Sequence, residues 1–541
     1  MKKSLLMGLL LIAQISLAAQ TPDSSRKFFS SCLKEADCEL KIFAEVSKTF
    51  RPSKEESALR DYLKAIHRTA QTSIWHRPLP WHQDDMGNVL IRIPGTGRFR
   101  FGPHKPLALQ SHMDMILAYK NAQPGEDLRP YFREGVQIET TDGWLHSKDK
   151  MTTLGADNGI GVAMEIRYLI DPRLEHPPLE LLFTVQEEIG LVGAMNMKLP
   201  LKSRKMINMD GMSPTGKTVL IGSQGALGHT LTATVAGEQD SQDSFKITVV
   251  LNNLAGGHSG NDIHRKRLNA VKVFSAFFKY VVSQAPGVRI QSVVAGDPGV
   301  LNKIATGFIA VLSIPSTSMT DSLQKDLEYK IRDMISQAAD ENPNYVLQIK
   351  VEPAGPGSSW VLSSDFSQRL VESIFQVPYG VLESDTQYPN SVKTSSNIGF
   401  LKLVANDQGS FQNDSGYLSR SFVNESLQKV SSESMSVLAT PFGEQAKWGP
   451  GMDFPAWKVP DNSPLLKEAL SVGNGVFQGT SIVAVGLEPS AFTQKYTDLD
   501  VISLAPYIVF AHTVNESLEV QSVRNVMHGL DEILKSQPSK P

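Results

Sequence analysis

The feature that most constrains the fold is an alternation of helices with short strands that are apolar on both faces. Apolar spacing predicts helices over 57–69 and 159–170, the second ending before Asp171-Pro172. Strands buried on both faces need helices on each side of the sheet. The sequence therefore predicts an α/β fold with a mostly parallel sheet. Its strands are predicted over 87–93, 107–110, 179–185 and 205–209.

The middle of the chain has a different pattern, in which long strands and amphipathic helices recur as a strand-helix unit. This pattern predicts an α+β domain inserted into the first domain. We expect the insertion over 218–440, so that 20–217 and 441–541 together form the first domain, to which strands at 482–485 and 501–504 return. Within the insertion, strands are predicted over 245–254, 308–314, 345–351, 397–404 and 416–423, and helices over 269–283, 322–339 and 424–438.

The amino terminus has the pattern of a secretory signal peptide over residues 1–19. Lys2 and Lys3 precede a short apolar run, and small residues follow it. Because Gln14 interrupts the run and a membrane-spanning helix needs about 20 apolar residues, we expect cleavage, no membrane association afterwards, and a periplasmic or secreted protein. In an oxidising compartment Cys32 and Cys38 would close a small disulfide loop; two free buried thiols are the alternative.

The charge composition excludes one class of partner. The 541 residues carry a formal net charge of -3, with no basic excess. Proteins that bind nucleic acid or a membrane surface need such an excess. Small molecules and peptides therefore remain as the expected substrates.

Metal-capable side chains follow three of the predicted strands. Ligands of open α/β sheets bind outside the carboxyl ends of the strands, so side chains at those ends are expected to converge. A further carboxylate stands between glycines in the segment GADNG, at the start of a predicted helix. These side chains are His112 and Asp114, Glu187 and Glu188, Asp210, and Asp157 of GADNG.

Imidazole nitrogen and carboxylate oxygen together suit a divalent ion such as zinc. Two ions about 3.5–4 Å apart can share a carboxylate and activate a water molecule. A general base must be a carboxylate that is not used as a ligand, and the pair Glu187-Glu188 offers one of each. Asp114, two residues after His112 on an extended segment, can hold the second imidazole nitrogen.

The motifs as a set resemble the aminoacyl-histidine dipeptidases, a branch of the dinuclear zinc peptidases that also include carnosinases and glutamate carboxypeptidase. They occur in the family's order across nearly the whole chain, and TLGADNGIG and GGHSG are specific to this branch. The matching segments are SHMDM (111–115), TTLGADNGIGVA (152–163), LLFTVQEEIGLVGA (181–194), INMD (207–210), GGHSGNDIH (256–264) and SLAPYIVFAH (503–512).

The resemblance implies metal-dependent hydrolysis of dipeptides or short peptides by a water that bridges two ions, with zinc expected and manganese or cobalt as alternatives. It implies that Glu187 is the general base and that Asp114 orients a ligand. The implied ligands are His112 and Asp210 for one ion, Glu188 and His512 for the other, and Asp157 as the bridge.

In the inserted domain, which the resemblance makes a lid and dimerisation domain, His258 would stabilise the oxyanion and Arg420 would hold the substrate carboxylate. Asn397, His264 and Glu488 are further candidates for substrate binding. A homodimer through this domain is the arrangement that the resemblance allows.

The sequence departs from the family pattern beside three proposed ligands. Ser111 replaces a glycine, Gly211-Met212 replaces Ser-Glu, and Phe510-Ala511 replaces Gly-Pro before His512. These changes keep every ligand but alter the wall of the site, so the substrate preference is open. Two alternative functions are also open: deacylation of N-acyl amino acids, and metal-stabilised peptide binding without catalysis.

Overall fold

The computed structural model describes residues 22–123, 126–338, 344–355, 359–386, 392–472 and 476–538. The chain forms two compact units, which we describe separately. Unit 1 comprises 1–222, 457–483 and 487–541, and unit 2 comprises 223–456 and 484–486. Unit 2 extends past the end of the predicted insertion, 218–440, because the short strands at 447–449 and 453–454 pair with its long strand at 225–236.

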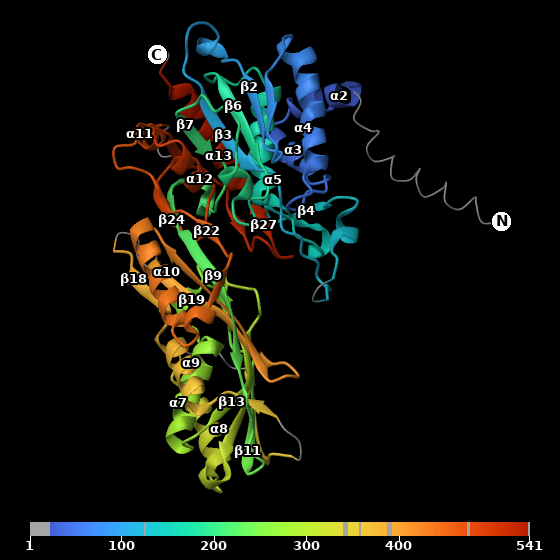
Figure 1. Cartoon of the computed structure of the whole chain (residues 1–541). Coiled ribbons are helices and arrows are strands. Elements are labelled where there is room, and N and C mark those ends of the chain that lie inside the picture. Colours follow the sequence, from blue (N-terminus) through green and yellow to red (C-terminus); the bar gives the residue numbers. More distant parts are fainter. Residues whose placement is uncertain are drawn as a thin grey trace, which may run out of the picture. The chain divides into compact units, whose positions relative to one another are not determined.

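Unit 1 is built on a nine-stranded sheet with the order β1-β2-β6-β3-β7-β25-β8-β23, in which β24 also pairs with β8 (Figure 1). The pairings among β6, β3, β7 and β25 are parallel, whereas β1, β2 and β8 join antiparallel. The strands are β1 (Trp81–Gln83), β2 (Val89–Ile93), β3 (Leu107–His112), β6 (Leu179–Thr184), β7 (Lys205–Asn208), β8 (Thr218–Ser223), β23 (Trp457–Lys458), β24 (Gly479–Val483) and β25 (Asp500–Ser503).

The predicted α/β class is confirmed, and the parallel part of the sheet is its centre. Every residue of β3 and β6 is buried, as expected for strands covered on both faces. A smaller sheet has the order β26-β27-β5-β4. Its strands are β4 (Ile138–Thr141), β5 (Trp144–Ser147), β26 (Ile508–Val509) and β27 (Ser517–Glu519).

The helices of unit 1 include both helices predicted from apolar spacing, α4 (Ser57–Ala70) and α5 (Ala156–Ile170). The remaining α-helices are α2 (Pro22–Cys32), α3 (Cys38–Val46), α6 (Val192–Met195), α11 (Pro464–Ser471), α12 (Pro489–Lys495) and α13 (Val520–Ser536). A disulfide joins Cys32 to Cys38 between α2 and α3. The predicted signal peptide lies outside the described residues.

Unit 2 is built on an antiparallel sheet with the order β16-β11-β15-β13-β19-β20-β9-β21; β18 also pairs with β19, and β22 with β9. The strands are β9 (Gly225–Ala236), β11 (Ser244–Asn252), β13 (Arg289–Gly296), β15 (Phe308–Pro315), β16 (Val346–Pro353), β18 (Gly380–Ser384), β19 (Val392–Ala405), β20 (Ser410–Ser421), β21 (Lys447–Gly449) and β22 (Asp453–Phe454).

Four helices pack on one face of this sheet (Figure 1). Their apolar residues, among them Phe274, Leu327 and Ile374, form one core with the inward residues of the strands. Burial of this apolar surface is the main force that stabilises such a layer. The helices are α7 (Ala270–Gln284), α8 (Leu323–Ser336), α9 (Ser364–Gln376) and α10 (Asn424–Ala439).

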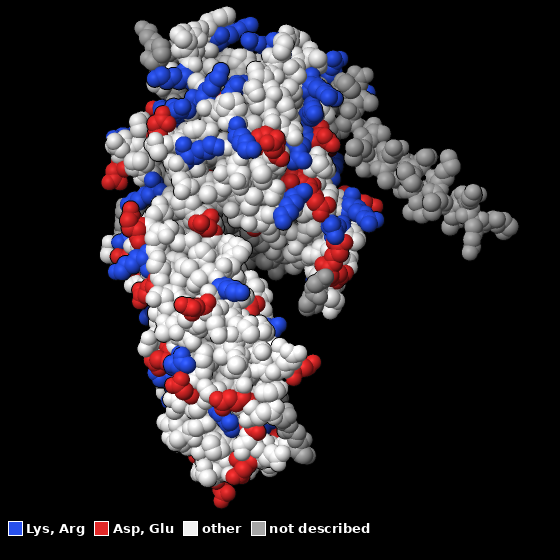
Figure 2. Space-filling model, viewed as in Figure 1, with Lys and Arg blue, Asp and Glu red and all other residues white. Residues whose placement is uncertain are grey.

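The surface agrees with the near balance of charge. Figure 2 shows acidic and basic side chains interspersed on the visible face. Among the described residues, no helix is long and apolar enough to cross a membrane.

Candidate metal centre

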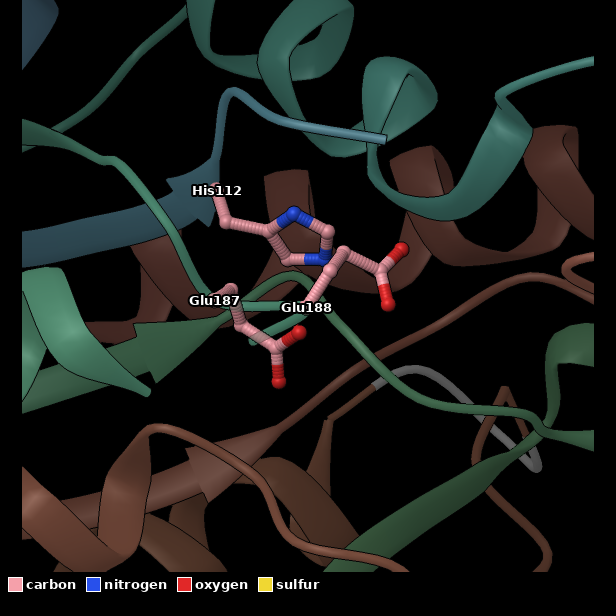
Figure 3. A group of neighbouring side chains, drawn as sticks. All are labelled: His112, Glu187 and Glu188. Atoms are coloured by element: carbon pink, nitrogen blue, oxygen red, sulfur yellow. The ribbon is translucent and has the colours of Figure 1, made fainter. Parts of the chain in front are cut away.

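The parallel centre of the unit 1 sheet brings the predicted ligands together. His112 is the last residue of β3, and Glu187 and Glu188 follow the end of β6. Asp210 follows β7 by two residues. Because these three strands are parallel neighbours, their carboxyl ends lie at one edge of the sheet. Figure 3 shows the side chains of Glu187 and Glu188 beside the ring of His112.

Asp157 connects two parts of the cluster. Its Oδ1 lies 3.1 Å from His112 Nε2, and its Oδ2 lies 3.3 Å from His512 Nε2. Asp210 Oδ2 is 3.9 Å from His112 Nε2, and Glu188 Oε2 is 2.9 Å from His512 Nε2. One carboxylate therefore faces two histidines, each of which faces a further carboxylate.

These side chains form overlapping groups that could each hold a cation. The potential ligand atoms within each group all lie within 4.8 Å of one another. The second oxygen of Glu188, Oε1, is buried and has no hydrogen-bond partner among the described residues, as expected of a carboxylate that ligates a cation. The groups are His112, Asp157 and Asp210; Asp157, Glu188 and His512; and His112, Glu187 and Glu188.

Asp114 holds the segment that carries the two glutamates. Its Oδ1 accepts a hydrogen bond from Glu187 N at 3.0 Å, and its Oδ2 accepts one from Glu188 N at 3.2 Å and one from Ser53 Oγ at 2.7 Å. Asp114 Oδ1 is also 3.5 Å from His112 Nδ1. Asp114 is therefore placed to orient both the histidine and the Glu187-Glu188 turn.

The pKa directions follow from crowding of carboxylates in a buried site. Burial raises the pKa of Glu187 well above its ordinary value, and the neighbouring carboxylates of Glu188 and Asp210 add to this effect. Burial and Asp157 raise the pKa of Asp210 to about 7. Asp157 is the exception, because the two histidines outweigh its burial and lower its pKa.

The carboxylates also raise the pKa of the two histidines, because they stabilise the imidazolium form. Burial alone would lower the pKa of His112, but Asp114 and Asp157 hold it well above its ordinary value. Burial would likewise lower the pKa of His512, but Asp157 and Glu188 outweigh this effect and raise it to about 11. Without a metal ion, therefore, protons on the histidines balance part of the negative charge.

Two buried residues that the sequence did not predict support this site. Arg51 Nη1 donates to the carbonyl oxygens of Met113 at 3.0 Å and Asp114 at 3.2 Å, and its Nη2 donates to that of Gly155. The Glu516 carboxylate accepts hydrogen bonds from Gly155 N at 2.9 Å and Asp157 N at 3.1 Å. Both side chains fix the loop that carries Asp157.

Glu488, predicted to bind substrate, lies in the interior of unit 1. Its Oε2 accepts hydrogen bonds from Gln110 Nε2 at 2.5 Å and Thr184 Oγ1 at 2.8 Å, and its side chain is fully buried. This geometry favours a role in positioning β3 and β6 beneath the ligands over direct contact with substrate.

The remaining candidates lie in unit 2. Asn397 is buried, and its amide binds the carbonyl oxygens of Leu301 and Lys303 and the side chain of Asn269. Its polar atoms are therefore used in hydrogen bonds within unit 2. His264 is exposed on a short 3-10 helix.

His258 and Arg420 are brought together around Gly260. A Cβ atom at Gly260 would lie 3.1 Å from His258 Cε1 and 3.3 Å from Arg420 Nε. His258 Nδ1 accepts hydrogen bonds from Gly260 N and Asn261 N, both at 3.2 Å, so a neutral ring carries its proton on Nε2. Arg420 is buried, and its Nε and Nη1 have no hydrogen-bond partner among the described residues.

Comparison with known proteins agrees with this fold. No protein-family model matches the chain. The chain is 27% identical over 510 residues to the cytosol non-specific dipeptidase of Escherichia coli, covering 92% of this chain and 97% of the relative.

Solved structures give the same result for the fold. The aminoacylhistidine dipeptidase of Vibrio alginolyticus superposes with a TM-score of 0.72 at 24% identity, covering 94% of this chain and 98% of that one. A tripeptidase of Staphylococcus aureus gives a TM-score of 0.54 at 16% identity, covering 92% and 97%. The resemblance to aminoacyl-histidine dipeptidases predicted from the motifs is confirmed.

The predicted periplasmic or secreted location is wrong. The Escherichia coli relative, matched over nearly the whole chain, is named as a cytosol enzyme. The prediction depended only on a charged start, an apolar run and small residues within 1–19. Such a pattern reflects only the amino-acid composition of the segment, and it does not by itself establish export.

Proposed function

We propose that this chain is a dinuclear metallopeptidase that hydrolyses dipeptides or short peptides. The single observation that carries the proposal is the position of Asp157, with one oxygen facing His112 and the other facing His512. That arrangement is what a carboxylate bridging two ions requires. We assign His112 and Asp210 to one ion, Glu188 and His512 to the other, and Asp157 to both.

The donor set favours zinc. Two imidazoles with carboxylates suit this borderline ion, and manganese and cobalt are accepted by similar ligands. When bound, two such ions polarise the scissile carbonyl and lower the pKa of water. The charge of the ions would also stabilise the ionised carboxylates and the neutral histidines of the cluster.

Glu187 is the proposed general base. It is half-buried beside Glu188 and Asp210, with a raised pKa, and it is not needed by either of the two ligand groups that share Asp157. In this role its carboxylate takes the proton of the attacking water and delivers it to the leaving amine. A base whose pKa is near the working pH performs both transfers efficiently.

Asp114 would keep His112 and the Glu187-Glu188 turn in their positions during these proton transfers. In unit 2, we assign His258 Nε2–H to the oxyanion that develops on the substrate. The unpartnered nitrogens of Arg420 are assigned to the carboxylate of the substrate, since a guanidinium binds a carboxylate through two parallel hydrogen bonds. A homodimer through unit 2 stays a prediction of the resemblance.

The test is an assay of purified protein of known metal content. We expect bound divalent metal, cleavage of a panel of dipeptides, loss of cleavage with a chelator, and recovery when zinc is restored. Cleavage of N-acetyl amino acids in place of dipeptides would favour the deacylase alternative. Bound metal with no cleavage of either substrate class would favour the peptide-binding alternative.

A further inference from the structure

Unit 2 contains a cavity that the proposed function does not use. Its volume is about 590 Å³, and small-molecule sites occupy about 300–1,000 Å³. The cavity lies where the segment before α7 and the first turns of α7 meet the carboxyl-terminal ends of α8 and α9. Its apolar wall includes Val273 and Ala276 of α7, Met334 of α8 and Phe375 of α9. This size and this wall are typical of a site for a small organic molecule.

Aromatic rings complete the apolar wall. Phe375 is 46% exposed, and the Nζ atom of Lys279 lies 4.0 Å from the centre of its ring. Tyr379, which also lines the cavity, is fixed by a hydrogen bond from its hydroxyl group to the carbonyl oxygen of Arg267 at 3.0 Å. A concave wall with accessible rings favours an occupant that has an apolar or aromatic body to bury.

The charged groups of the wall are all cationic. Lys266, Arg267 and Lys272 line the cavity, and no carboxylate does so in the part of the chain that the structure describes. Arg267 has an acidic partner, because its Nη1 lies 3.4 Å from Asp262 Oδ1. Lys266 is exposed. The wall therefore has the charge that attracts an anion.

Lys272 is the cation whose charge is least compensated. It is partly buried, and its Nζ donates hydrogen bonds to the carbonyl oxygens of Ile374, Phe375 and Val377 at 2.8, 2.9 and 2.7 Å. These carbonyl groups satisfy the three protons but carry no net charge. Burial lowers the pKa of Lys272 to about 8, so the amine is still largely protonated at pH 7. A partly buried ammonium group of this kind gains stability from a nearby anion.

Acidic side chains close to the wall have cationic partners of their own. Glu372 is paired with Lys279 at 2.8 Å, and Asp333 lies 3.5 Å from the Nζ atom of Lys330. Burial is the cause of the lowered pKa of Lys272, and no described carboxylate offsets it. The negative charge that would balance Lys272 must therefore come from outside the described residues.

Arg267 connects the cavity to the turn that carries His258. Its Nη1 donates to the carbonyl oxygen of Gly256 at 2.7 Å, and its partner Asp262 accepts a hydrogen bond from His258 N at 2.9 Å. An occupant of the cavity would thus lie against a segment that holds this turn in place.

We propose that this cavity is a binding site for a small organic anion with an apolar or aromatic body, whose negative charge faces Lys272 and Lys266. All of the described wall residues belong to unit 2. None of them is a proposed metal ligand, catalytic residue or substrate-binding residue. The inference therefore goes beyond the proposed function and does not depend on it.

The test uses three indole compounds that differ in charge and are titrated into the full-length protein by calorimetry. Indole-3-acetate is an anion, indole-3-acetamide is its neutral counterpart, and tryptamine is a cation. We expect a dissociation constant of about 1 mM or lower for indole-3-acetate, as is usual for a ligand of this size. The amide should bind at least about fivefold more weakly, which is the effect of one ion pair, and tryptamine should not bind.

Two variants locate the site. Ala276→Trp places a large side chain in the cavity and should weaken the binding of indole-3-acetate by at least about tenfold. Its matched control is Ala439→Trp, at a partly buried alanine of α10 that does not line the cavity, and this variant should bind as the wild type does. Lys272→Met should bring the affinities for the acid and the amide to within about twofold of each other, a ratio that a general loss of stability would not change.

Three results would overturn the inference: no binding of indole-3-acetate to the wild type, equal binding of the acid and the amide, or unchanged binding in Ala276→Trp. The last result would place the anion elsewhere, including at the metal centre. If Lys272→Met fails to fold, because it loses the bonds to the end of α9, the comparison of Ala276→Trp with Ala439→Trp decides.

Discussion

The polar cluster of unit 1 carries an excess of negative charge, whereas that of unit 2 carries a positive charge. In unit 1, the carboxylates of Asp157, Glu188 and Asp210 crowd around two histidines, and Glu188 Oε1 is buried with no hydrogen bond from the part of the chain that the structure describes. In unit 2, Arg420 is a buried cation with two unpartnered nitrogens among the described residues, and burial lowers its pKa to about 10.

Buried charges are costly unless they are paired. A cluster with excess negative charge therefore indicates a cation as its ligand, and a buried guanidinium beside a histidine indicates an anion. The two clusters support the proposal that unit 1 holds the metal ions and that unit 2 holds an acidic group of the substrate.

The largest expected effect is that of Glu187→Gln, which removes the base but leaves the two ligand groups that share Asp157. The general base contributes about 10²–10⁴-fold to such reactions, so we expect kcat for a dipeptide to fall by about 10³-fold. Metal content, measured by mass spectrometry of the purified protein, should stay unchanged. Glu134→Gln, an exposed glutamate of unit 1, is the control. Loss of metal from Glu187→Gln would mean that Glu187 is a ligand.

The second expected effect is a dependence of metal affinity on pH that is confined to unit 1. Ligation requires neutral imidazole, whereas the pKa of His512 is raised to about 11 and that of His112 is raised well above its ordinary value. Metal binding must displace these protons, so affinity for zinc should rise by at least about tenfold per pH unit from pH 6 to 8. A competitive titration with a chelator of known affinity measures it, and a flat profile would contradict the protonated apo state.

The same pKa shifts have a consequence for the metal-free protein. A raised pKa stabilises the folded state fully below the unfolded value of about 6.5. This contribution is then lost as the pH rises toward the folded values. Thermal unfolding of the metal-free chain should therefore show a stabilising contribution from His112 and His512 that declines above pH 6.5.

The smallest of these effects concerns unit 2. Arg420→Lys keeps the charge but removes the two parallel donors, and hydrogen bonds to charged groups contribute about 2 kcal/mol. We expect kcat/KM for Leu-Gly to fall about 30-fold, with little change for Leu-Gly amide, which has no carboxylate. Arg332→Lys, an exposed arginine of unit 2, should change neither rate. An equal loss for both substrates would remove Arg420 from carboxylate binding.

Most of the ligand cluster could be predicted from the sequence, because parallel strands place their carboxyl ends at one edge of the sheet. His112, Glu187, Glu188 and Asp210 each follow an apolar run, and the structure brings all of them together. Asp157 and His512 lie outside that rule, on the first turn of α5 and in the β26–β27 loop. Asp157 was predicted from its place between glycines at the start of a helix, whereas the inclusion of His512 depended on the resemblance of SLAPYIVFAH to a known pattern.

What the sequence did not predict is the support beneath the site. Arg51 and Glu516 bind backbone atoms far away in the chain, and no periodicity marks a charged residue that will be buried in this way. For the same reason the sequence could not show that the side chains of Glu488 and Asn397 make buried hydrogen bonds. Their polar groups turn out to face the interior, where they bind Gln110 and Thr184 in one case and Leu301 and Lys303 in the other.

If one carboxylate, Asp157, is shared by two ions, its removal must lower the number of ions bound per chain. We would dialyse the wild-type protein, Asp157→Ala and the surface control Asp85→Ala against zinc and count bound metal by mass spectrometry. We expect about two ions per chain for the wild type and for Asp85→Ala, and fewer than one for Asp157→Ala, since both ions lose a ligand. A wild-type chain that binds a single ion, or an Asp157→Ala chain that still binds two, would contradict it.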